Sequence, residues 1–448
     1  MSDLLAIGAS GVRTYQGALT TTSENIANVG VEGYARRSAV IAEVGAASGT
    51  YSAGTLNGLG SRIAGTARSA DTLKSAAVRT AGADLARTES GSAWLDRIQT
   101  ALTGNQLTTR VTSFFTSATT LAADPNSSAA RTAMLESATT VAGAFQATGR
   151  ALDQVAADLD ATADQAAAAL NGFGRALAKV NDGLARVQPD SAAAASLADQ
   201  RDKLLEDMAA LVDVTVATDS FGRATVRLGD TSGPVFVSGV DAGAVTYARS
   251  AGNVSFALFR DGQQSAVMPN GGALGGIADG ANRVADARLQ LDGIATDFTT
   301  KVNAFQAGGQ TLTGTAPGAP MFATDPASPT EITLALTDAA DIAAASVGGG
   351  TRDGSNLASL TAARTTSKVE GRTTALIAGN AAALEQRKLV ADAQSAIRDG
   401  AVDARDAASG VNLDTEAVDL LRFQQAYQAS SKVIQVARDI FQSIIGIN

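Results

Sequence analysis

The sequence contains no cysteine and no histidine among its 448 residues. These absences exclude a disulfide framework, a thiolate iron–sulfur cluster and a zinc site with cysteine or histidine ligands. They also exclude a cysteine nucleophile and a Ser-His-Asp triad. Only carboxylate or lysine chemistry stays open to an enzyme. We therefore expect a non-enzymatic protein with no metal and no cofactor.

Aromatic residues are scarce, at 4% of the chain, although 45% of the residues are hydrophobic. Buried area must then come from many small contacts along long surfaces, which favours extended helical packing. The 35 basic and 44 acidic residues give a net charge of -9, and the basic residues do not cluster in the sequence. Nucleic acid is therefore not expected as a partner.

No run of about 20 apolar residues is present, and the first positive charge is Arg13. We therefore expect neither a membrane span nor a cleavable secretory signal. If the protein leaves the cell, another route must carry it.

The eight prolines all lie between Pro125 and Pro329, so that long helices are permitted at both ends of the chain. Apolar residues recur every three or four positions from Val141 to Val187, which predicts a helical rod of about 70 Å. A second such row, from Val284 to Phe305, predicts a returning partner helix.

Six short apolar runs separate these two rows, and turn sequences such as Asp219–Gly222 and Arg260–Gly262 connect them. Alternating runs with hairpin turns predict a small β domain inserted into the rod. The alternative is a set of irregular surface loops.

Two further sequence features do not meet the requirements of a chemical site. The glycine run Gly271–Gly276 lacks the Lys-Ser/Thr pair of a phosphate loop, so a flexible exit from the β domain is expected there. Asp158 and Asp160 are two positions apart on a predicted helix and do not face one another. Trp94 is expected to be a core anchor.

Both ends of the chain carry apolar residues at every seventh position, which is typical of coiled-coil helices. The alternative is ordinary core packing within one domain. The rows at the C-terminal end are Leu413, Leu420, Tyr427, Ile434 and Phe441, with Phe423, Ser430, Ala437 and Ile444; those at the N-terminal end are Leu5, Val12, Leu19 and Ile26, with Gly8, Tyr15, Thr22 and Val29.

The polar residues Thr22 and Ser430 lie in rows where a stable helix pair would favour apolar side chains. A thin pair of this kind is marginal alone. We therefore expect the two ends to form a surface that neighbouring subunits complete.

A helix-to-arm joint is predicted directly after the N-terminal helix. Asn25 and Asn28 can satisfy backbone groups where the helix ends, and Gly33 permits a turn. Tyr34 and Arg36 then lead into an extended segment. The alternative, an ordinary Asn/Gly helix end, does not account for the heptads.

The same residues carry a resemblance to a known family. Ser23–Asn28 (SENIAN) and Gly33–Arg36 (GYAR) resemble the N-terminal signature of bacterial flagellar axial proteins. Gly410–Ala417 (GVNLDTEA) and Leu421–Ile434 (LRFQQAYQASSKVI) resemble the C-terminal signature, in the form that is similar to the hook-associated members. The match covers about 40 residues at each end.

This resemblance implies a structural subunit at the junction between the flagellar hook and filament, exported without a cleavable signal. The implied partners are other copies in a ring, hook subunits, a second junction protein with the filament, and an export chaperone. The alternatives are a rod, hook or filament subunit, or a carboxylate-dependent hydrolase on a helical stalk. The predicted assembly interface is Leu5, Val12, Leu19, Asn25, Ile26, Asn28, Gly33, Tyr34, Arg36, Leu413, Leu420, Phe423, Tyr427, Ile434, Phe441 and Ile444.

The predicted fold is mainly α and elongated, with terminal coiled-coil helices and a helical rod that carries a small inserted β domain. The predicted segments are an N-terminal helix (1–35), an extended arm (36–66), the first part of the rod (67–212), the β domain (213–275), the returning rod helix (276–306), a loop or small insertion (307–350), the last part of the rod (351–409) and a C-terminal helix (410–448).

Overall fold

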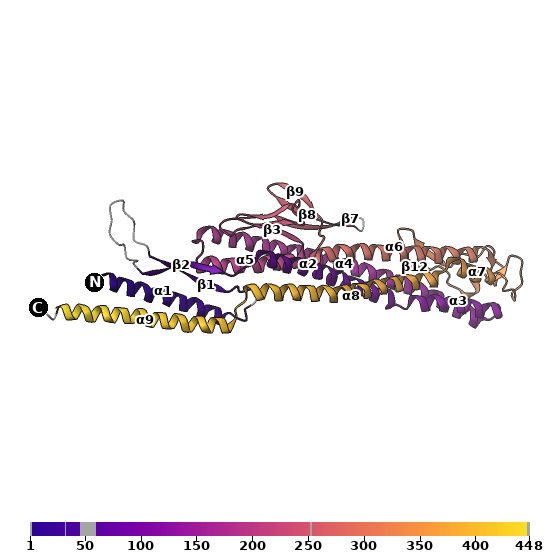
Figure 1. Ribbon diagram of the computed structural model, residues 1–448. Coiled ribbons are helices and arrows are strands. Elements are labelled where there is room, and N and C mark those ends of the chain that lie inside the picture. Colours follow the sequence, from indigo (N-terminus) through magenta and orange to yellow (C-terminus); the bar gives the residue numbers. More distant parts are fainter. Residues whose placement is uncertain (1, 32, 45–59, 251–252, 446–448) are drawn as a thin grey trace.

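The computed structural model describes residues 2–31, 33–44, 60–250 and 253–445. They form an elongated, mainly α molecule in which a rod of long helices ends in a separate pair of helices (Figure 1). The predicted fold class is confirmed. The two ends of the chain lie at the same end of the molecule (Figure 1).

The rod consists of seven helices among the described residues. Its longest helix, α4, runs from Ser128 to Arg186 without a break, and Ser127 caps it by accepting a hydrogen bond from the Ala130 amide. The others are α2 (Thr72–Thr103), α3 (Leu107–Ala123), α5 (Ala192–Leu211), α6 (Gly272–Ala307), α7 (Leu357–Ser367) and α8 (Val369–Ser409).

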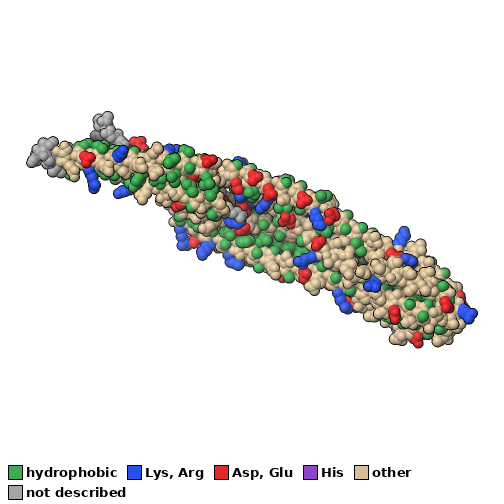
Figure 2. Space-filling model, turned by 90° about the horizontal axis from the view of Figure 1, so that it is seen from below, with side chains coloured by type: hydrophobic (Ala, Val, Ile, Leu, Met, Phe, Trp, Pro, Cys, Tyr) green, Lys and Arg blue, Asp and Glu red, His purple; other side chains and the backbone are tan. Residues whose placement is uncertain are grey.

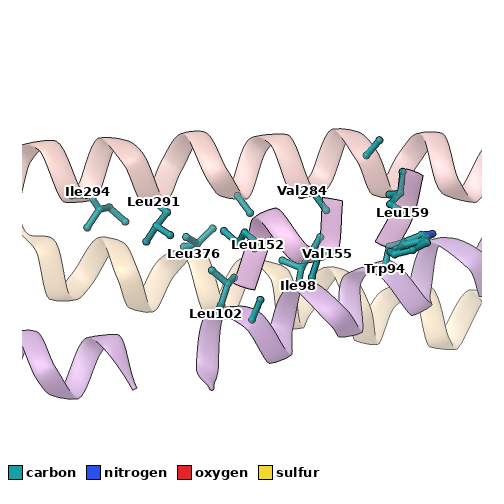
Figure 3. Close-up of a cluster of buried hydrophobic side chains, with 14 of the residues drawn as sticks. Trp94, Ile98, Leu102, Leu152, Val155, Leu159, Val284, Leu291, Ile294 and Leu376 are labelled. Atoms are coloured by element: carbon teal, nitrogen blue, oxygen red, sulfur yellow. The ribbon is translucent and has the colours of Figure 1, made fainter. Parts of the chain in front are cut away.

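The core lies where α2, α4, α6 and α8 meet (Figure 3). Trp94 and Ile98 of α2 face Leu159 of α4 and Val284 of α6 there, so that Trp94 is the expected core anchor. The apolar row from 284 to 305 is buried in α6, which packs along α2 as well as along α4. The predicted returning helix therefore has two partners.

The glycine run at 271–276 is not a flexible exit, and that expectation was wrong. It forms the buried first turns of α6, where a Cβ at Gly276 would lie 2.5 Å from the Arg87 carbonyl oxygen. Gly272 has φ of +69° and a Cβ there would lie 2.4 Å from the Val212 nitrogen. Glycine is therefore required by close helix packing.

Between α5 and α6, seven short strands among the residues that the structure describes form the β domain. One sheet has the order β3-β4-β5-β6 and the other β7-β8-β9, all antiparallel. Phe236 is fully buried against Gly174 of α4, which fixes the domain on the rod. The strands are β3 (Val214–Thr218), β4 (Ala224–Leu228), β5 (Val235–Ser238), β6 (Asp241–Ala242), β7 (Ala244–Ser250), β8 (Asn253–Arg260) and β9 (Gln263–Val267).

Asp160 of α4 accepts hydrogen bonds from Tyr247 and Arg249 of β7. Burial, together with the hydrogen bond to Asp160, raises the pKa of Tyr247 from 10.0 to about 12. In the unfolded chain the phenol ionises near its ordinary pKa, so the stability from this contact falls as the pH rises from 10 to about 12. We expect a late step in the near-ultraviolet tyrosinate titration that Tyr247→Phe removes. An unchanged titration in that variant would contradict this assignment.

The region predicted as a loop or small insertion contains short strands and a helical turn. Phe322 of β11 packs against Phe114 and Phe298 in the core. Buried Arg131 of α4 donates to the Ile342 carbonyl at 2.8 Å. The elements are β10 (Gly309–Gln310), β11 (Phe322–Asp325), β12 (Ser328–Leu334), η1 (Ala339–Asp341) and β13 (Ala345–Ser346).

Candidate assembly site at the paired ends

The two terminal helices, α1 (Ser2–Ala27) and α9 (Leu413–Ile445), lie side by side and antiparallel (Figure 1). The interface between the two helices, the seam, is narrow because glycines of α1 face side chains of α9. A Cβ at Gly8 would lie 2.7 Å from Ile434 Cγ1, and one at Gly11 would lie 2.6 Å from Ser430 Oγ. Glycine therefore allows the two helices to approach closely.

The heptad rows divide between this seam and the surface. Phe423 and Thr22 are buried in this seam, so a neighbouring subunit cannot contact them. Leu5, Val12, Leu19, Ile26, Leu420, Tyr427 and Ile434 are half-buried, and Leu413 and Phe441 are exposed. The side chain of Ile444 lies outside the described residues.

A second apolar row on α9 was missed by the sequence reasoning. Its members form two groups, 418–421 and 433–440, with steps of three or four residues within each group. They fall between the heptad positions, so the heptad pattern did not reveal them. They are exposed by 39% to 66%: Val418, Leu421, Val433, Val436 and Ile440. The terminal pair thus presents apolar side chains on more than one face.

The segment after α1 forms a hairpin, β1 (Arg37–Glu43) with β2 (Ser61–Arg68), that packs on α1. Thr14 Oγ1 donates to the Ser61 carbonyl at 2.8 Å, and the Ser61 amide donates to Ser10 Oγ at 3.2 Å. The predicted extended arm is thus paired at both of its ends, and residues 45–59 lie outside the described part.

Asn25 is the centre of the joint that the sequence predicted after α1. It is fully buried, and its Nδ2 donates to the Arg37 carbonyl at 2.7 Å and to Glu416 at 3.0 Å. Its Oδ1 accepts from the Arg37 amide at 3.0 Å and from the Tyr34 hydroxyl at 2.9 Å. An asparagine whose hydrogen bonds are all made in this way holds a single backbone geometry.

Glu416 of α9 is 1% exposed and completes the joint from the other end of the chain. Arg36 Nε donates to it at 2.6 Å, while Arg36 Nη2 reaches Asp419 at 3.1 Å. The sequence placed Glu416 only in a favourable first turn, because nothing local shows a partner 380 positions away. Arg36 therefore joins the two terminal signatures.

The remaining predicted joint residues shape the turn. Asn28 Nδ2 donates to the Glu24 carbonyl at 2.7 Å where α1 ends, and Gly33 has φ of +79°. Tyr34 stacks under Arg37, and burial raises the pKa of its phenol.

A second group of ion pairs fastens this joint to the rod. Asp199 of α5 accepts from Arg37 at 2.7 Å and from Arg68 at 2.6 Å. Within the rod itself, Glu206 of α5 pairs with Arg405 of α8 at 2.7 Å. These residues were not predicted as part of the site, since acidic side chains on a helix are usually solvated.

Asp158 and Asp160, the two carboxylates considered in the sequence, both make structural contacts. Asp160 holds the β domain, and Asp158 pairs with Arg97 at 3.2 Å. Over the described ranges, no group of three or more acidic side chains could hold a metal ion. No described helix is long and apolar enough to cross a membrane.

The terminal pair is thin and rich in exposed apolar side chains, so its local opening requires little free energy. In the isolated chain we therefore expect weak amide exchange protection before about residue 35 and after about residue 410, and strong protection in α4. Assembly should raise the protection of both ends. Equal protection of the ends and α4 in the isolated chain would contradict this prediction.

A helical rod, paired ends and a fixed joint between them define a structural subunit built for assembly. The family model of the flagellar hook-associated protein FlgK helical domain matches residues 94–322, about half of the chain. The chain belongs to this family. A second model, the flagellar basal body rod FlgEFG protein C-terminal, matches residues 405–447.

Relatives named flagellar hook-associated protein 1 are similar to the chain. That of Escherichia coli is 29% identical over 51% of this chain and 42% of its own length, and that of Salmonella typhimurium is 28% identical over 68% and 56%. The chain thus spans about half the length of these two. That of Bacillus subtilis is 23% identical over 96% of this chain and 95% of its own.

The fold is also similar to that of a solved structure, the flagellar hook junction protein FlgK from Burkholderia pseudomallei. The TM-score is 0.65 at 15% identity, covering 74% of this chain and all of the other. The likeness supports the elongated helical fold described above.

Proposed function

We propose that this protein is a structural subunit of the bacterial flagellum that forms the junction between hook and filament. Its terminal helices assemble into the inner layer of the axial structure. The observation that carries the proposal is the terminal pair, whose helices are joined through Asn25, Arg36 and Glu416. Asp199 ties this joint to the rod, and the pair leaves apolar rows uncovered. Family membership supports the flagellar setting.

The uncovered rows suggest copies of the same chain as the first partners. Val418, Leu421 and Val436 lie on a different side of α9 from the seam, so a neighbour can cover them while the α1–α9 pair stays intact. The half-buried row at Leu5, Val12 and Leu19 offers a second contact. A subunit with two different contact surfaces can form a closed ring.

The further partners proposed are hook subunits on one side and a second junction protein with the flagellin filament on the other. An export chaperone and export without a cleavable signal belong to the same proposal. The β domain lies on the side of the rod and leaves the terminal pair free (Figure 1).

A hydrolase on a helical stalk has no support from the arrangement of the carboxylates, and we propose that the protein is not an enzyme. A rod, hook or filament subunit would use similar terminal helices. The match of the FlgK helical domain model to residues 94–322 favours the junction subunit over these alternatives.

Immunogold labelling of intact flagella tests this proposal. We expect a narrow band of label where the hook meets the filament. A matched strain that lacks the protein controls for antibody specificity. Label along the whole hook or filament would refute the junction assignment.

A further inference from the structure

A cleft lies beside the joint, between the C-terminal part of α8 and the helices α2 and α5. Its volume is about 840 Å³. Val78 and Leu85 of α2 and Val402 of α8 line it, together with Arg79 and Arg405. Figure 2 shows this face of the molecule hollowed, with hydrophobic side chains inside the hollow.

Helix α8 is fastened on both sides of this cleft. Before it, Asn380 Nδ2 donates to the Leu95 carbonyl at 2.9 Å, and Arg387 Nη2 reaches Asp279 at 2.7 Å. After it, Arg405 pairs with Glu206 at 2.7 Å, and the Ser409 carbonyl accepts from the Arg36 amide at 2.8 Å.

Between these two anchors α8 is unsupported. In the chain as described, residues 395–404 make no hydrogen bond or ion pair to any element outside α8. This span of ten residues is about 15 Å long. At its start, the Gln394 Oε1 atom is buried without a hydrogen-bond partner among the described residues. Such an atom makes the present position of the helix less than optimal.

Gly400 lies within the unsupported span. It is exposed, and a Cβ built there meets nothing within 4 Å, so close packing does not explain this glycine. Glycine inside a helix weakens it by about 1 kcal/mol relative to alanine. The helix is thus weakest where it has the least support and where a cleft with both charged and apolar lining residues lies at its side.

We propose that α8 bends at Gly400 into this cleft, that the ion pairs of Asp199 and Glu206 open as it does so, and that the bend changes the angle between the terminal pair and the rod. Val402 then packs against Val78, which removes apolar surface from water. Only residues 410–412 separate α8 from α9, so the terminal pair follows the movement. A role for this movement between hook and filament rests on the proposed function, whereas the bend itself is a property of the isolated chain.

Disulfide trapping tests the bend, because the chain has no cysteine of its own. Ser75 and Val402 line the cleft from α2 and α8, so the variant Ser75→Cys/Val402→Cys carries one thiol on each wall. We expect it to form an intramolecular disulfide under mild oxidation. The control is Ser75→Cys/Asp403→Cys, because the exposed residue 403 does not line the cleft. Absence of a disulfide in the first pair, or equal formation in both, overturns the proposal.

A second pair of variants tests the role of Gly400. Gly400→Ala should slow disulfide formation about five-fold, because alanine stiffens the helix by about 1 kcal/mol. Gly379→Ala makes the same change in the supported part of α8, where a Cβ also meets nothing within 4 Å, and should leave the rate unchanged. Equal rates in the two variants overturn the assignment of the bend to Gly400. Both measurements use the purified chain, so their failure leaves the immunogold result untouched.

Discussion

A strain that lacks this protein is expected to build complete hooks, to release filament subunits into the medium and to be non-motile. A junction subunit is needed after the hook is finished, and its loss removes the surface on which the filament grows while export continues. Electron microscopy of the hooks and an assay of flagellin in the medium measure this result. Loss of a rod or hook subunit should instead leave no complete hook.

A chain truncated after Gly410 separates the rod from the terminal pair in the same strain. It keeps α2 to α8 and loses α9, so that α1 loses its partner helix and Asn25 loses Glu416. We expect it to be made but to restore neither filaments nor swimming, whereas the full chain restores both. Normal filaments in the deletion strain, or rescue by the truncated chain, would refute the junction assignment.

The substitution Arg36→Met is expected to have the second large effect, on the stability of the terminal helix pair. The change leaves Glu416, which is 1% exposed, without its cation. Removing one partner of a buried ion pair costs about 3 kcal/mol or more. We expect the terminal pair to open, with amide exchange in α1 and α9 about a hundred-fold faster and α4 unchanged.

Arg422→Met is the matched control for Arg36→Met. Arg422 also pairs with Asp419, at 3.2 Å, but its side chain is 65% exposed. An exposed pair contributes at most about 1 kcal/mol. Faster exchange in α4 after Arg36→Met would show that the whole chain is destabilised, and equal effects of the two changes would show that burial of Glu416 is unimportant.

Periodicity was sufficient to predict the rod and the helices at both ends. Apolar spacing of three or four residues predicted the row in α4 but left open whether its glycines interrupt the helix. The helix continues through Gly149 and Gly174, which face neighbouring side chains. Alternating short runs predicted the strands between 214 and 267. In each case a local pattern fixes a local structure.

What depends on contact between distant segments could not be predicted. The run at Gly271–Gly276 has the composition of a loop, and only its contact with α2 shows that it is the start of a helix. Glu416 has the appearance of an ordinary N-terminal acidic residue until Arg36 and Asn25 are beside it. A heptad pattern identifies only the residues that face one partner helix. It therefore did not predict the exposed apolar residues on the other side of α9.

The distance in sequence between Asn25 and Glu416, 391 positions, also bears on the order in which the protein folds. Closing so long a loop in a flexible chain costs about 5 kcal/mol of entropy. The folded rod removes most of this cost once the arm is docked on it, because the Arg36 amide then bonds the Ser409 carbonyl at the end of α8, at 2.8 Å. We therefore expect the rod to fold first and α1 to wait unpaired during synthesis, since its partner helix is made only later, Glu416 coming 391 residues after Asn25.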